Sequence, residues 1–78
     1  MNDHEKMTGQ IFNKMIEAYK KEALLGRHPH VRLEGHSPAT KLYRIRIESE
    51  QISEGLEMRP AEFVAFKNLL KQNGIELQ

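Results

Sequence analysis

The sequence predicts one small α+β domain, an antiparallel sheet of two to three strands packed by two helices in the order α-β-β-(β)-α. Two observations lead to this prediction. Apolar and polar residues alternate in the middle of the chain, as in strands, and apolar stripes at helical spacing flank that region on both sides. A chain of 78 residues forms a single domain with a thin core, so an oligomer interface would add apolar burial.

The first helix is expected over residues 3–25, where apolar residues recur at helical spacing. Asp3 and Thr8 are alternative N-caps, and Gly26 can take the left-handed conformation that ends a helix. The expected buried stripe consists of Met7, Ile11, Phe12, Met15, Ile16, Tyr19 and Ala23.

The clearest strand spans residues 40–48, TKLYRIRIE. Successive side chains of a strand point to opposite faces, which makes one face apolar and the other largely basic. The two faces carry Tyr43, Ile45 and Ile47 on one side and Leu42, Arg44 and Arg46 on the other.

Two shorter strands are expected beside this one. Residues 30–34, HVRLE, would pair with it in a hairpin through the turn GHSPA. Residues 56–58 would form a third strand, with Gly55 marking a bulge or turn just before it.

The second helix follows in the stretch RPAEFVAFKNLLKQNG. Pro60 suits its first position, and Gly74 suits its end, where Ile75 can contact Leu70. The tail, residues 75–77, is either frayed or a short edge strand. The expected core is Val31, Leu33, Tyr43, Ile45 and Ile47 of the sheet against Ile11, Phe12, Met15, Phe63, Phe66 and Leu70 of the helices.

No pattern in the sequence predicts catalysis, a cofactor or a metal. Cysteine is absent, and no serine or threonine lies in a nucleophile elbow or a glycine-rich phosphate loop. His28, His30 and His36 lie close in sequence, and the first two would share a face if extended, but no carboxylate completes a ligand set. The acidic run Glu48, Glu50, Glu54 and Glu57 is interpreted as a solvated face. We therefore expect a protein that is not an enzyme.

The N-terminal segment has no apolar stretch typical of a secretion signal, and no apolar run is long enough to span a bilayer. These features favour a cytoplasmic protein without a membrane partner.

Charge is segregated along the chain, with a formal +5 over residues 19–46 and −4 over residues 47–58. A basic sheet face can bind phosphates, so a nucleic-acid-binding module is one hypothesis. It would use Arg32, Arg44 and Arg46, helped by Lys41, Lys20 and Lys21. The other interpretation of this face is a solvated surface with cross-strand ion pairs, for example between Glu34 and an arginine.

The preferred hypothesis is a small regulatory or adaptor-type module that binds another protein, a second copy of itself included. Four apolar residues remain after the helical stripes are assigned, and they are candidates for the interface: Leu24, Leu25, Leu42 and Val64. A short sheet also has open edges at which another strand can pair.

Overall fold

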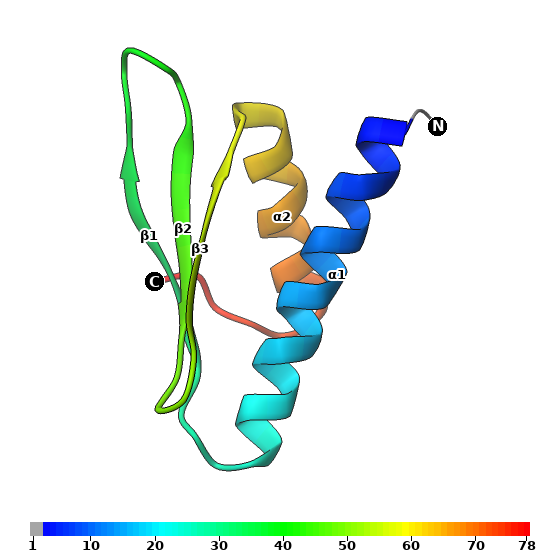
Figure 1. The fold of residues 1–78 in the computed structure, drawn as a ribbon, viewed down its shortest axis with the longest axis vertical. Coiled ribbons are helices and arrows are strands. Elements are labelled where there is room, and N and C mark those ends of the chain that lie inside the picture. The colour runs from blue at the N-terminus through cyan, green and yellow to red at the C-terminus, as the bar shows by residue number, and fades with distance from the viewer. Residues whose placement is uncertain (1–2) are drawn as a thin grey trace.

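The computed structural model describes residues 3–78, with side chains from residue 9 onward, and it confirms the predicted α+β fold. Three strands form one antiparallel sheet, and both helices lie on the same side of it (Figure 1). The N-cap alternatives Asp3 and Thr8, and Met7 of the apolar stripe, concern side chains outside the described residues. The elements are α1 (Asp3–Leu24), β1 (His30–His36), β2 (Tyr43–Glu48), β3 (Ser53–Met58) and α2 (Pro60–Gln72).

The sheet has the order β1-β2-β3, with β2 in the centre. β2 begins at Tyr43 and not at residue 40, because Lys41 has a left-handed backbone (φ 62°) and belongs to the loop. β1 continues to His36, two residues beyond the expected strand, and the extra length is accommodated by a bulge between Leu33 and Gly35.

β3 is confirmed, but the expected bulge or turn at Gly55 is wrong. Gly55 lies inside the strand and pairs with Arg46 of β2. The Arg46 side chain lies over it, and a Cβ at Gly55 would come within 3.2 Å of Arg46 Nη2. The glycine therefore makes room for an arginine and does not interrupt the strand.

Both helices end in the same glycine motif, in which the backbone reverses through a left-handed residue. In α2 the Ile75 N–H donates to the Leu70 carbonyl (2.9 Å) and the Gly74 N–H to the Lys71 carbonyl (3.1 Å). Gly74 has φ 69°, as the sequence predicted, and Ile75 is buried in the same apolar cluster as Leu70. In α1 the corresponding bond joins the Arg27 N–H to the Glu22 carbonyl.

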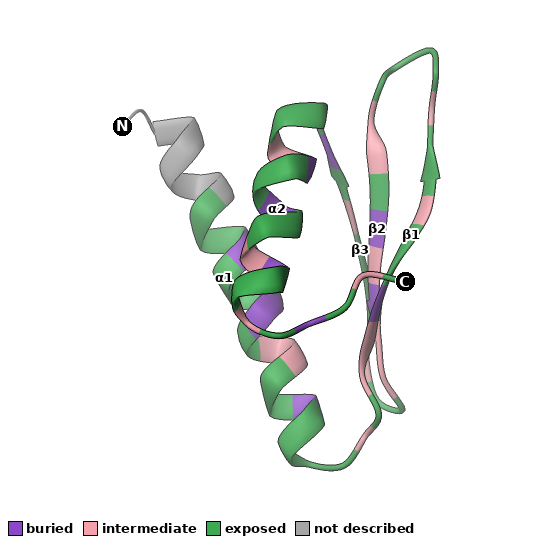
Figure 2. Cartoon of the chain, turned by 180° about the vertical axis from the view of Figure 1, so that it is seen from behind, coloured by how far each residue is buried: buried purple, intermediate pink, exposed green. Residues whose placement is uncertain are grey.

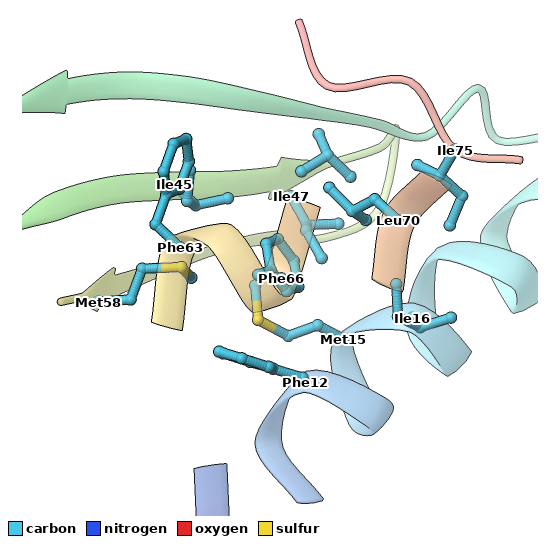
Figure 3. Close-up of a cluster of buried hydrophobic side chains, with 11 residues drawn as sticks. Phe12, Met15, Ile16, Ile45, Ile47, Met58, Phe63, Phe66, Leu70 and Ile75 are labelled. Carbon is cyan, nitrogen blue, oxygen red and sulfur yellow. The ribbon is translucent and has the colours of Figure 1, made fainter. Parts of the chain in front are cut away.

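The core lies between the sheet and the two helices (Figures 2 and 3). Phe66 of α2 packs against Phe12 of α1, with ring centroids 4.9 Å apart. Tyr43 is partly buried and stacks on Phe63 at 4.2 Å. The buried apolar residues are Phe12, Met15, Ile16, Val31, Ile45, Ile47, Met58, Phe63, Phe66, Leu70 and Ile75.

Among the residues whose side chains are described, three that were expected in the apolar stripe or core are exposed. Leu33 points to the helical side but remains 39% exposed, because it lies beside the bulge at the β1 edge. Ile11 is 41% exposed because it borders a surface groove, and Ala23 lies near the end of α1. Glu22 takes the inward position beside Ala23.

Glu22 is 3% exposed and ties the end of α1 to the turn between β2 and β3. Its Oε1 accepts a hydrogen bond from Ser49 Oγ (2.5 Å), and its Oε2 accepts one from Arg27 Nη1 (3.0 Å). The Ser49 hydrogen bond, with Arg27 beside it, lowers the pKa of the Glu22 carboxyl below its ordinary value of 4.5. The sequence did not reveal this contact, because the partners are 27 residues apart.

We expect replacement of Ile45 by alanine to lower the free energy of unfolding by about 2–4 kcal/mol, as for other buried aliphatic truncations. Ile45 is fully buried in the centre of β2. Urea denaturation followed by circular dichroism measures the change. Leu24→Ala is the matched control, since Leu24 is 89% exposed, and it should stay within about 0.5 kcal/mol of the parent.

We expect Ser49→Ala to destabilise the protein more at neutral pH than in acid. A carboxylate with a lowered pKa stabilises the fold above its unfolded pKa of about 4.5, and this stabilisation is lost as the pH falls through the folded pKa. Loss of the Ser49 hydroxyl raises the pKa of Glu22, so the difference from the parent should shrink between pH 7 and pH 3. The control is Ser53→Ala, because the Ser53 hydroxyl bonds Arg46 and not Glu22. A difference that does not change with pH would contradict this role.

Candidate functional site

The two edges of the sheet differ, and this difference defines the candidate site. At the β1 edge the C-terminal residues return alongside the strand (Figure 1). The Leu33 N–H donates to the Gln78 carbonyl, and the Gln78 N–H donates to the Val31 carbonyl, both at 2.8 Å. The tail is therefore held against β1, but it makes an isolated parallel bridge between Leu77 and Val31 and not the short edge strand that was one of its two predicted states.

Among the described residues, no segment pairs with the outer edge of β3. Because the Ser49 N–H donates to the Ile52 carbonyl (2.9 Å), these residues form a bonded pair at the start of the ladder. Bonded pairs alternate with non-bonded pairs in an antiparallel ladder, so Glu54, Leu56 and Met58 direct their backbone groups toward β2. The residues between them, Ser53, Gly55 and Glu57, direct their N–H and C=O groups away from the sheet.

A groove of about 250 Å³ lies beside this edge, where α1 passes over β3. Its lining is largely apolar and includes the exposed side chain of Ile11 and the half-buried Leu56. Arg59 and Glu62 lie at the start of α2, where the Arg59 N–H donates to Glu62 Oε1 (2.9 Å). The full lining is Ile11, Phe12, Leu42, Leu56, Glu57, Met58, Arg59 and Glu62.

The arginines of the predicted basic face lie together on the side of the sheet away from the helices, but two of them are paired. Arg32 donates twice to Glu48 Oε1, from Nε at 2.9 Å and from Nη2 at 2.5 Å. Arg46 donates from Nε to Glu34, as the ion-pair interpretation anticipated, and from Nη1 to Ser53 Oγ at 3.0 Å. The Arg32 hydrogen bond lowers the pKa of the Glu48 carboxyl, so this carboxylate stays charged into mild acid.

Arg44 is exposed and lies opposite Glu57 in the ladder. The three arginines on this face are therefore matched in number by three carboxylates, Glu34, Glu48 and Glu57. Of the lysines in the nucleic-acid hypothesis, Lys41 lies in the β1–β2 loop, and Lys20 and Lys21 lie on α1, in the layer across the sheet. The structure therefore places the three arginines on one face of the sheet, whereas the three lysines lie elsewhere.

The four apolar interface candidates do not form one patch. Leu42 lies at the groove beside β3, together with Ile11, which the sequence assigned to the core. Leu24 and Leu25 lie at the far end of α1 from Ile11, and Val64 is an exposed residue of α2. The groove was not predicted, because it joins residues from α1, the β1–β2 loop, β3 and α2.

The three histidines that lie close in sequence, His28, His30 and His36, have separate environments. His28 has a left-handed backbone (φ 52°), so it does not share an extended face with His30. His28 lies 3.9 Å from Glu50, His30 lies 4.0 Å from Glu48, and His36 stacks on Tyr43. Within the part of the chain whose side chains are described, no three histidine or carboxylate groups are placed to hold a metal.

Neither of the described helices is long and apolar enough to cross a membrane. No family model, curated protein or solved structure matches the chain.

We expect the two edges to differ in amide hydrogen exchange in dilute solution. The amide hydrogens of Gly55 and Glu57 should exchange faster than those of Leu56 and Met58, which point to β2. Leu33, at the other edge, should be protected by Gln78, and removal of Gln78 should abolish that protection. Exchange measured by NMR tests this pattern. Uniform protection along β3 in a dilute monomer would contradict the assigned ladder.

Proposed function

We propose that this protein is a small non-catalytic module that binds protein by accepting a strand at the β3 edge. The observation that carries the proposal is the asymmetry of the sheet. Val31 and Leu33 at the β1 edge bond to Gln78, whereas no described residue bonds to the outward backbone groups of β3. An exposed row of N–H and C=O groups is a template for another strand.

The groove beside β3 supports the proposal. In strand addition, main-chain hydrogen bonds provide affinity and pockets for alternate side chains provide specificity. A strand paired with β3 would direct every second side chain toward the helical layer, where Ile11 and Leu56 border the apolar groove. The ligand would therefore be an extended segment with apolar residues at alternate positions.

Nucleic-acid binding is the alternative, and it has less support from the geometry. The arginines of the outer face are matched by carboxylates, and Arg32 and Arg46 are already bonded to glutamates. Phosphate binding would require these bonds to be exchanged or broken, which reduces the gain from each contact. The six basic residues of that hypothesis also lie in different layers of the fold.

A site-specific photo-crosslinking experiment tests the proposal. A photoreactive residue is placed at Glu57, on the open edge, and in a second variant at Glu76, an exposed glutamate of the tail. In cells that express the chain, we expect protein adducts from position 57 and few from position 76.

Gly55→Pro should abolish the adducts from position 57. The Gly55 N–H points away from β2, so proline removes an edge donor without breaking a bond inside the sheet. Gly55→Ala keeps the donor and places the same Cβ against the end of the Arg46 side chain as proline does, so it is the matched control. Equal adducts from both positions, or adducts that survive the proline, would reject strand addition at β3, and adducts with nucleic acid would favour the alternative.

A further inference from the structure

We infer that the strand accepted by β3 is the β3 strand of a second copy, paired antiparallel about a two-fold axis at Gly55, so that two sheets join into one of six strands. This inference rests on the proposed strand addition and names its partner. It is argued from the outward backbone groups, the charges beside them and the position of α1.

The outward backbone groups restrict the register. Ser53, Gly55 and Glu57 can bond only to one another across the axis, because the residues between them are bonded to β2. When Gly55 faces Gly55 of the second copy, Ser53 faces Glu57, and all three residues of each edge are paired. If the two-fold axis passed through Leu56 instead, Ser53 would face Arg59 of the second copy. The N–H and C=O of Arg59 already bond within α2. If the axis passed through Glu54, the Glu54 carboxylates of the two copies would face each other.

Charges on the outer face are complementary in the Gly55 register. Glu57 of each copy meets Ser53 of the other, and Ser53 Oγ accepts a hydrogen bond from Arg46 Nη1 at 3.0 Å. The Glu57 carboxylate therefore reaches a hydroxyl donor with a guanidinium directly behind it. The pairing occurs twice because of the two-fold axis, so each copy contributes one carboxylate and one guanidinium.

On the helical side of the interface, Glu54 of each copy would lie opposite Leu56 of the other. A two-fold axis perpendicular to the sheet leaves all four helices on one face. α1 is the helix on the β3 side, since its Ile11 and Phe12 share a groove with Leu56 and Met58. The two α1 helices would thus approach each other above the joined edges, and the exposed Ile11, with Leu56, would be covered there.

Cysteine crosslinking tests the register, and the natural chain contains no cysteine to interfere. Residues opposite each other in a bonded antiparallel pair have Cα atoms about 5.5 Å apart, within the range of about 4.4–6.8 Å that a disulfide spans. Gly55→Cys should therefore oxidise to a covalent dimer. Ser53→Cys and Glu57→Cys should crosslink when mixed and much less when either is alone. Glu76→Cys, an exposed position of the tail, is the control for random collision.

Sedimentation velocity across concentration tests association without oxidation. The parent and Gly55→Ala should form a dimer, while Gly55→Pro should dissociate at a concentration about tenfold higher or more, since it removes two edge hydrogen bonds from the pair. Circular dichroism checks that each variant is folded. The amide hydrogens of Gly55 and Glu57 should also become protected as concentration rises.

The outcomes separate this inference from the proposed function. A strict monomer at millimolar concentration, or a dimer that crosslinks through other positions, overturns the self-pairing. If the photoreactive residue at Glu57 then captures a different protein, strand addition at β3 stands and only the partner is wrong. If the photoreactive residue at position 57 captures no protein in a chain without further substitutions, both the self-pairing and the proposed strand addition fail.

Discussion

The fold depends on the alternation of side chains in β2. Ile45 and Ile47 point into the core, and Arg44 and Arg46 point to the opposite face, where Arg46 joins a layer of ion pairs. A slip of one residue would bury guanidinium groups and expose both isoleucines, at a cost comparable to the whole stability of a small domain. Both neighbouring strands take their register from β2, so this one alternation also determines which residues of β1 and β3 face the helices.

Much of this arrangement could be predicted from the sequence because its signals are local. The alternation in β2, the proline at the start of α2 and the glycines at the ends of both helices each depend on neighbouring residues. Local signals failed where a distant residue decided the outcome. Gly55 was interpreted as a break in the strand, whereas its role is set by Arg46 of the adjacent strand.

The candidate site was harder to predict for the same reason. Whether an edge strand is free depends on the segments that pair with it, and the sequence could not show that Gln78 would bond to Val31 and Leu33 of β1 and that no described segment would pair with the outer edge of β3. The basic face was predicted correctly as a set of arginines, but their pairing with Glu34 and Glu48 depends on the register across the hairpin. Leu42 was recognised as an apolar residue among arginines, while its neighbour in the groove, Ile11, was assigned to the core.

The buried carboxylate of Glu22 has a consequence for local motion. It holds the last turn of α1, the segment that leads into β1 through Arg27, and the β2–β3 turn through Ser49. The Glu50 N–H, in turn, donates to the Arg27 carbonyl (3.1 Å) and binds the same segments to each other. Three pieces of chain that would otherwise fray independently must therefore open together, as one cooperative unit. Fluctuations at this end of the molecule should be rare and large, while those along the β3 edge are frequent and small.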